Sequence, residues 1–439
     1  MPSFVLIPVY IALMITPLVL SFGQDLPARG LRNDLASGLA LVAFTILLVE
    51  FVLSGRFRVI SRRIGSDVSM RWHQLLARGA IVLAVAHPFL YSAPYAPARP
   101  WDPTRAETLL MRADYLLAGT LALALLVPFV LTAIYRDQLS YRYETWRRMH
   151  GIGAGLIVGL VAVHALIGGR YSAQGPLAAY WVALLAIAAA SLLFVYALKP
   201  LSQLRHRYRV ASLERIAERT WEVVLEPDGG EAMTFRAGQF VWLNIGHSPF
   251  SLDENPFSIA TAPGDRPRIG FLIKEVGDFT RSLGAVEPAT HAYIDGPHGH
   301  LTIDGRQADG IALIAGGVGL APLMSIARQM RHDGDSRPVV LVYGNRTAEQ
   351  IAYRAELDDM SRAMDMRVEH VLSEPPEGWS GRTGMIDEPQ LAAIFGGRPD
   401  PRWLYVLCGP PGMLRAAENA LRGLGVAPNR ILSERFVYD

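Results

Sequence analysis

The stretch Met70–Leu90, MRWHQLLARGAIVLAVAHPFL, carries two histidines fourteen residues apart in an apolar segment. A second stretch, Met149–Gly169, MHGIGAGLIVGLVAVHALIGG, repeats that spacing. Fourteen residues of α-helix advance ~21 Å and stop about 40° short of four turns, so both members of a pair lie on one helix face. The pattern therefore predicts two levels of ligands along two helices. The four histidines are His73, His87, His150 and His164.

Histidines inside an apolar span are rare and tend to mark function. Four of them at two levels fit two stacked planar metal centres, for which bis-histidine haems are the natural candidate. A histidine bonded to a backbone carbonyl is the ordinary alternative for one residue alone, and the repeated spacing argues against it. A structural zinc ion gathers four ligands at one point, which residues ~21 Å apart along a helix cannot do. We therefore predict that the two pairs bind two b-type haems.

Apolar residues make up 51% of the 439 residues, and nearly all of the excess lies before residue 200. Six stretches there approach or exceed the ~20 residues that cross a bilayer. The first has no basic leading region and no evident small-residue cleavage site, so it is expected to stay as a helix. Residues 1–199 are thus predicted to form an all-α membrane domain in contact with lipid. The six expected spans are Ser3–Phe22, Leu35–Leu53, Leu75–Tyr91, Tyr115–Ile134, Ile152–Gly168 and Leu177–Leu198.

Basic residues are concentrated after the second, fourth and sixth spans, and the opposite loops carry fewer. By the positive-inside rule both termini are expected in the cytoplasm, with the protein in a bacterial inner or plasma membrane. The formal net charge is only +2, and the basic residues lie where topology needs them, so nucleic-acid binding is not expected. The single cysteine, Cys408, excludes an intramolecular disulfide and a four-cysteine iron–sulfur cluster.

After Lys199 the sequence changes to short strands separated by glycine and proline, which predict an antiparallel β-barrel over residues 200–305. These strands are Trp221–Leu225, Phe240–Ile245, Ile269–Ile273 and His291–Ile294. Over residues 306–439 strands alternate with helices, which predicts an α/β domain with a parallel sheet. Its strand and helix pairs are Gly310–Ala315 with Leu320–Met330, Val339–Tyr343 with Ala348–Met360, and Trp403–Cys408 with Met413–Leu424.

The turn Gly316–Pro322, GGVGLAP, follows the first strand of the α/β domain and opens a helix. At such a point backbone amides and the helix dipole can bind a pyrophosphate. A glycine-rich turn alone is weak evidence, because any tight strand-to-helix turn can use glycine.

Five motifs occur here in the order seen in ferredoxin–NADP reductase-type flavoproteins. They are NPFSI (255–259), GDFT (277–280), GPHG (296–299), GGVGLAP (316–322) and CGPPGM (408–413). With the six spans and the paired histidines, the chain resembles the ferric reductase and NADPH oxidase superfamily. That resemblance implies FAD as a cofactor and NADPH as the electron donor, with NADH as the alternative.

The resemblance also implies roles for individual residues. Pro256, Phe257 and Ser258 would line the flavin, with Ser258 near its reactive nitrogen, and Gly277 and Thr280 would bind the FAD pyrophosphate. Gly316, Gly317, Gly319 and Pro322 would hold the nicotinamide nucleotide, and Cys408 and Gly409 would lie where nicotinamide meets flavin. Phe436 would cover the flavin ring, with Tyr438 as its rival. Relatives usually carry a basic residue at the position of Asn255, so one FAD contact is expected to be missing.

Arg346 follows the second strand of the nucleotide domain. An arginine at this strand end normally meets a 2′-phosphate, whereas an acidic residue favours NADH. Arg346 therefore favours NADPH, and Glu349, within one turn, opposes that choice.

A hydride carries two electrons and a haem iron accepts one, so a flavin between them must separate the pair. Without a four-cysteine cluster, FAD is expected to pass electrons directly to an inner haem held by His73 and His150. The outer haem, held by His87 and His164, would pass them to dioxygen, giving superoxide. A ferric chelate is the alternative acceptor, and a haem relay that feeds a periplasmic partner is a third hypothesis. Glu50 and Arg78 could bind a haem propionate or each other.

Overall fold

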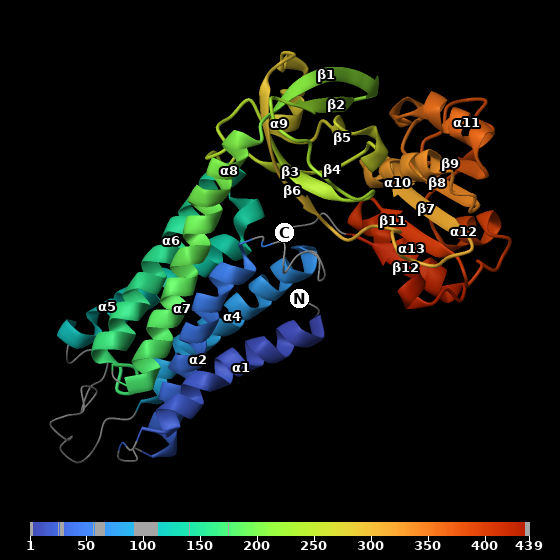
Figure 1. Ribbon diagram of the computed structural model, residues 1–439. Helices are drawn as coiled ribbons and strands as arrows, with labels where there is room; N and C mark the ends of the chain where they lie inside the picture. Colours follow the sequence, from blue (N-terminus) through green and yellow to red (C-terminus); the bar gives the residue numbers. More distant parts are fainter. Residues whose placement is uncertain are drawn as a thin grey trace. The chain divides into compact units, whose positions relative to one another are not determined.

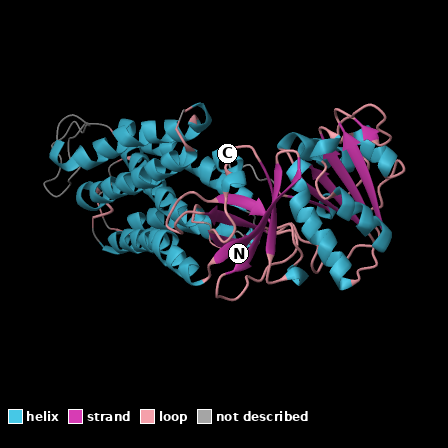
Figure 2. Cartoon of the chain, turned by 90° about the horizontal axis from the view of Figure 1, so that it is seen from above, coloured by secondary structure: helices cyan, strands magenta, loops and turns pink. Residues whose placement is uncertain are grey.

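The computed structural model describes residues 3–24, 26, 30–55, 57, 66–91, 113–139, 141–173 and 175–434. The chain divides into two compact units, Met1–Lys199 and Pro200–Asp439. The first unit is helical and the second contains two β-sheets (Figures 1 and 2). Each unit is described by itself below.

The first unit contains six helices that are long and apolar enough to cross a membrane, within the residues described. Large apolar side chains such as Val19, Leu75 and Val82 are exposed on them, as expected for surfaces that face lipid. The helices are α1 (Ser3–Phe22), α2 (Leu31–Leu53), α4 (Ser66–Leu90), α5 (Ala113–Ile134), α6 (Tyr143–Val163) and α7 (Gly175–Leu193).

Two of these helices begin about nine residues before the expected apolar spans. Helix α4 begins at Ser66 rather than Leu75, and α6 begins at Tyr143 rather than Ile152. Their first turns are polar and charged, and a hydropathy pattern excludes such residues although their backbone hydrogen bonds form as readily as others. As a result, His73 and His150 lie inside regular helix, where the fourteen-residue spacing has its geometric meaning.

Helix α6 continues into a π-helical turn, His164–Gly168. A similar π-helical turn, Phe194–Leu198, links α7 to the short helix α8 (Lys199–Arg205). Such turns are rare and often occur at functional sites. The first of them begins at one of the four predicted haem ligands.

Helix α2 packs against α1, α4 and α7, and α5 packs against both α4 and α6. The contact between α2 and α7 is centred on the rings of Phe44 and Trp181, whose centroids are 4.6 Å apart and which are both buried. Aromatic pairs of this kind contribute roughly 0.5–1.5 kcal/mol beyond the area they bury. The histidine pairs lie on α4 and on α6 with its π-helical turn. Helix α4 is held by its contacts with α2 and α5, and α6 by its contact with α5.

The first sheet of the second unit is antiparallel, in the order β4-β3-β6-β1-β2-β5. An isolated bridge between Ile259 and Phe271 joins the β4 edge to the β5 edge and closes the sheet into a barrel. Both residues are fully buried in its core. The strands are β1 (Tyr208–Ala217), β2 (Thr220–Pro227), β3 (Phe240–Ile245), β4 (Asn255–Ser258), β5 (Ile269–Lys274) and β6 (His291–His298).

The second sheet is parallel, in the order β10-β9-β8-β7-β11-β12. Its strands are β7 (Ile311–Gly316), β8 (Val339–Asn345), β9 (Met366–Leu372), β10 (Arg382–Thr383), β11 (Leu404–Cys408) and β12 (Ile431–Ser433). Helices α10 and α11 cover one face and α12 and α13 the other, so the predicted fold class is confirmed. These helices are α10 (Leu320–Asp333), α11 (Arg354–Ala363), α12 (Glu388–Ile394) and α13 (Pro411–Gly423).

The expected helix Ala348–Met360 is wrong in its first half. A 3₁₀ turn, Ala348–Gln350, is followed by Tyr353 in the left-handed region at φ 54°, and α11 begins only at Arg354. A left-handed residue cannot continue a right-handed helix. The Tyr353 hydroxyl donates to Glu222 Oε1 of the barrel at 2.6 Å, so a contact between the two sheets accompanies this conformation.

Candidate functional site

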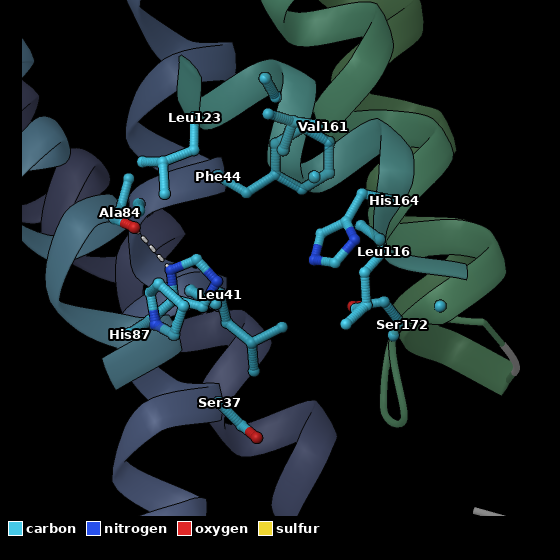
Figure 3. Close-up of a pocket in the computed structure, with 18 of the residues that line it drawn as sticks. Ser37, Leu41, Phe44, Ala84, His87, Leu116, Leu123, Val161, His164 and Ser172 are labelled. Carbon is cyan, nitrogen blue, oxygen red and sulfur yellow. Dashed lines mark hydrogen bonds between the residues drawn. The ribbon is translucent and has the colours of Figure 1, made fainter. Parts of the chain in front are cut away.

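His87 of α4 and His164 of the π-helical turn line one cavity of about 180 Å³ in the helical unit. Figure 3 shows both imidazole rings directed into the space between these helices. The rest of the wall is mainly aliphatic and aromatic and comes from α2, α5 and α6, with Arg170 as a cation in the lining. Labelled wall residues are Leu41, Phe44, Leu116, Leu123 and Val161 (Figure 3).

The donor atoms of this pair suit a metal centre. His87 Nδ1 donates a hydrogen bond to Ala84 O at 2.7 Å, which leaves the lone pair on Nε2. His164 Nδ1 is buried and has no hydrogen-bond partner among the described residues. Gly119 of α5 lies so close that a Cβ there would be 2.6 Å from that nitrogen. A buried imidazole beside a cavity, with room kept for its ring, fits a haem ligand.

The second pair lies elsewhere along the same helices. The ring centroids of His73 and His150 are 6.5 Å apart, at an interplanar angle of 79°. A metal ion with a nitrogen ~2.0 Å away on each side would separate the two ring centroids by roughly 6 Å, so the spacing fits a shared iron. The rings of Phe129 and Trp146 stack on His150, at 4.4 Å and 5.0 Å between centroids.

Each pair takes one histidine from α4 and one from α6 or its π-helical extension. The two helices therefore run in the same direction, and the pairs fall at two levels along them. Glu50 bonds to His73 and Tyr10, and Arg78 is exposed, so of the two alternatives for Glu50 and Arg78 their mutual pairing is not the one formed. The contact between Glu50 and His73 could not be predicted from the sequence, because it joins α2 to α4 and depends on how these helices pack.

The predicted flavin residues Pro256, Phe257 and Ser258 lie half-buried on β4, paired with β3. The ring of Phe257 faces that of Phe279 at 6.1 Å between centroids. A Cβ at Gly277 would meet no atom within 4 Å, so this turn has open space above it. That space and the adjacent aromatic pair fit a bound FAD.

Thr280 stabilises the same turn from within. Its hydroxyl accepts hydrogen bonds from the backbone N–H groups of Val276 at 2.8 Å and Gly277 at 3.0 Å. The hydroxyl is thus used by the turn, which gives Thr280 the role of shaping the loop that the resemblance assigned to the FAD pyrophosphate.

The glycine-rich turn of the nucleotide domain packs directly on the loop after β11. A Cβ at Gly319 would lie 2.2 Å from Cys408 O, and one at Gly409 would lie 3.0 Å from Gly316 N. Gly317 has φ +53° and open space beyond it, and Pro322 is buried in the first turn of α10. The two loops thus pack backbone against backbone, and the open space at Gly317, before the start of α10, fits a bound pyrophosphate.

Cys408 ends β11 at the contact between these loops and is buried. Burial, and then the negative charge of Glu434, raise the pKa of its thiol, so the thiol is neutral at physiological pH. Glu434 is also buried, and its Oε1 lies 3.7 Å from His300 Nδ1. No motif indicated a role for Glu434, which stands two residues before Phe436. Phe436 and Tyr438 lie outside the described residues.

Arg346 is exposed just after β8, where its Nε lies 3.7 Å from Glu374 Oε2. The sequence pattern did not indicate this carboxylate, because Glu374 follows the next strand of the sheet, β9. Exposed ion pairs contribute about 0–1 kcal/mol, so the guanidinium can exchange this partner for a phosphate.

Comparisons with known proteins match both units. The family "Ferric reductase like transmembrane component" matches residues 39–161, and "Oxidoreductase NAD-binding domain" matches residues 313–419. The chain is 31% identical over 235 residues to "Ferredoxin--NADP reductase B" of Sorangium cellulosum, a match that covers 52% of this chain and 96% of that protein. The chain belongs to the ferredoxin–NADP reductase family. In this chain, the flavoprotein module is fused to a ferric reductase-like transmembrane domain. The protein is thus an integral membrane oxidoreductase that uses FAD and NAD(P)H.

Two further likenesses concern this ferredoxin–NADP reductase-type module and the fold. The chain is 28% identical over 218 residues to the reductase component of propane 2-monooxygenase from Mycolicibacterium goodii, covering 48% of this chain and 62% of that protein. The crystal structure of flavohemoglobin from Malassezia yamatoensis with bound FAD and heme has a TM-score of 0.50 and 16% identity, covering 91% of this chain and 98% of that one. The latter is a likeness of fold.

Proposed function

We propose that this protein carries electrons from NAD(P)H, through FAD and two b-type haems, across the membrane to dioxygen, which becomes superoxide. The proposal rests on the two histidine pairs at two levels of a helical unit that is fused to a ferredoxin–NADP reductase module. The only cysteine, Cys408, is buried in the nucleotide domain, so this chain cannot ligate a four-cysteine iron–sulfur cluster. Flavin and haem would therefore exchange electrons without a cluster between them.

The chemistry that the bound groups supply is hydride acceptance by flavin and one-electron transfer by haem iron. His73 and His150 would hold the inner haem, and His87 and His164 the outer one. Ala84 O fixes the ring of His87 through its hydrogen bond to Nδ1. Gly119 leaves the space that the ring of His164 occupies. The mainly aliphatic and aromatic wall of the cavity would give the outer pair a largely apolar surrounding.

The second unit would position the hydride donor. Gly316, Gly317, Gly319 and Pro322 would bring backbone amides and the start of α10 against the NAD(P)H pyrophosphate. Pro256, Phe257 and Ser258 would line the flavin, and the turn at Gly277, held by Thr280, would receive the FAD pyrophosphate. Cys408 and Gly409 would border the nicotinamide, where a neutral thiol adds no charge. Arg346 would bind the 2′-phosphate of NADPH.

The orientation follows from the arginine-rich turns. We place both termini and the NAD(P)H site in the cytoplasm, and the outer haem toward the far side of a bacterial inner or plasma membrane.

The lining of the outer cavity supports dioxygen as the acceptor, because a small neutral molecule can enter a mainly aliphatic space. Ferric chelates are the second candidate. Arg170 in the lining, and the arginines of the outer loops in the sequence, would attract an anionic chelate.

Purified protein in lipid vesicles tests the acceptor. We expect NADPH oxidation that depends on dioxygen, and reduction of a soluble probe that superoxide dismutase suppresses. Oxidation that requires ferric citrate would favour the second candidate. Oxidation with a soluble dye, but with neither dioxygen nor iron, would indicate a relay that feeds a periplasmic partner.

Haem content tests the histidine assignment. We expect two haems per native chain, and loss of one in the His87→Ala and His164→Ala variants. An unchanged ratio of haem to protein in both variants would contradict the assignment.

A further inference from the structure

The two histidines of α4 have different partners at Nδ1. His73 Nδ1 lies 2.6 Å from Glu50 Oε2 on α2. His87 Nδ1 lies 2.7 Å from Ala84 O, a backbone carbonyl one turn earlier in its own helix. The first partner is a carboxyl group and the second is a neutral amide.

The Glu50 carboxyl group is buried and accepts hydrogen bonds at both oxygens. Its residue is only 6% exposed, and the Tyr10 hydroxyl donates to Oε1 at 3.2 Å. If His73 binds iron through Nε2, its Nδ1 carries the proton and donates to Oε2. Both oxygens of the carboxyl group are therefore engaged, one by His73 and the other by Tyr10. Tyr10, Glu50 and His73 thus form a hydrogen-bonded chain across three helices that ends at a proposed haem ligand.

A carboxylate bonded to Nδ1–H makes an imidazole a stronger electron donor to its metal. A buried negative charge near the iron acts in the same direction, because both stabilise the ferric state over the ferrous state. His87 Nδ1 instead donates to a neutral backbone carbonyl, which is a weaker acceptor than a carboxylate. On the basis of the proposed function, we infer that Glu50 is a positioning residue that lowers the reduction potential of the inner haem below that of the outer haem.

The consequence is a preferred direction of electron transfer. An electron on the inner haem would then move to a site of higher potential when it passes to the outer haem. Hydrogen bonding to an axial ligand is one of the means by which a protein sets a haem potential. Tyr10 moderates the effect, because its hydrogen bond withdraws charge from the carboxylate.

Substitutions at Glu50 and at Tyr10 should shift the potential of the inner haem in opposite directions. Glu50→Gln removes the charge and keeps an oxygen that can accept from His73, so the inner-haem potential should rise. We expect at least a tenfold change in the electron-sharing equilibrium between the haems, which is about 59 mV for a one-electron couple. Tyr10→Phe leaves the carboxylate with one donor fewer, so the same potential should fall.

Redox titration of the full-length protein by visible spectroscopy measures both haems. The His87→Ala background, expected to keep only the inner haem, assigns its midpoint. Asp34→Asn is the matched control, because it removes a carboxylate from the first turn of the same helix without touching His73. The inner midpoint should not move in that control, while the electron paramagnetic resonance signal of the inner ferric haem should change in Glu50→Gln.

The outcomes separate this inference from the proposed function. A native protein without haem would overturn both. Two bound haems whose midpoints are the same in the native protein and in Glu50→Gln would overturn the role of Glu50 alone. If Glu50→Gln does not retain the inner haem, the sign of the Tyr10→Phe shift decides, and an upward shift would overturn the inference.

Discussion

Arg346 stands at the end of β8 beside Glu374, both exposed to solvent. An exposed ion pair of this kind is weak, whereas a charge-assisted contact with a phosphate contributes ~1.5–3 kcal/mol. The preference for a nucleotide can therefore rest on one side chain.

Arg346→Ala should raise the Michaelis constant for NADPH roughly tenfold or more and leave that for NADH nearly unchanged. Steady-state kinetics with both nucleotides measure this. Arg362→Ala is the control, since it removes another exposed arginine that is paired with Asp359. Equal losses with both nucleotides would show that Arg346 supports the fold instead.

Cys408 provides a second test at the scale of one residue. Because burial and Glu434 raise the pKa of the thiol, the reactive thiolate is scarce in the folded protein. Alkylation by iodoacetamide at pH 8 should be at least tenfold slower in the native protein than in denaturant. Equal rates would mean that the thiol is open to solvent. The raised pKa also means that the contribution of this group to stability is present below pH ~8.5 and is lost as pH rises further.

Local spacing made some of these residues predictable and left others out of reach. The histidine pairs could be predicted because a fourteen-residue interval within one helix fixes their common face. Glu50 could not be paired with His73, because that contact joins two helices. Likewise, the hydroxyl of Thr280 turns back to its own loop, which a motif alone does not reveal.

At the scale of elements, the loops after β7 and β11 can pack closely because glycine has no side chain. The carboxyl ends of the two strands are neighbours in the sheet, and Gly319 touches the backbone of Cys408. The order of strands and helices could be predicted from alternating apolar runs. The start of α11 could not, because it depends on the left-handed Tyr353 and its contact with the barrel.

Gly319→Ala should destabilise the second unit by about 1–3 kcal/mol, because its Cβ would meet a carbonyl oxygen at 2.2 Å. The melting temperature, measured by flavin fluorescence, should fall by ~2–4 °C for each kcal/mol of lost stability. Gly412→Ala is the matched control, with no atom within 4 Å of the added Cβ. If both variants melt at the same temperature, the contact between the two loops is looser than described.

At the scale of the whole molecule, the chain has two compact units with separate apolar cores. Their border at Lys199 and Pro200 coincides with the change in sequence texture after Lys199. The border proposed at residues 305 and 306 is different in kind, because the barrel and the α/β layers belong to one compact unit.

Residues 200–439 expressed alone should therefore fold, bind FAD and reduce a soluble dye with NAD(P)H. They should contain no haem, since all four proposed ligands lie before residue 199. Size-exclusion chromatography tests whether this unit folds, its absorbance spectrum shows whether it binds FAD or haem, and dye reduction measures its activity. An aggregated or flavin-free product would show that the second unit needs the membrane domain to fold.

The largely buried Arg328 of α10 donates to Ala260 O after β4 at 2.9 Å and to Glu356 Oε2 of α11 at 2.6 Å. Its guanidinium also lies over the ring of Tyr353, 4.5 Å from the centroid. For protein engineering this means that the useful crossover point in a hybrid reductase is residue 199. A hybrid that takes only the nucleotide domain from a relative would keep Arg328, Glu356 and Tyr353 together but would separate them from the barrel backbone at Ala260, so the barrel must come from the same relative.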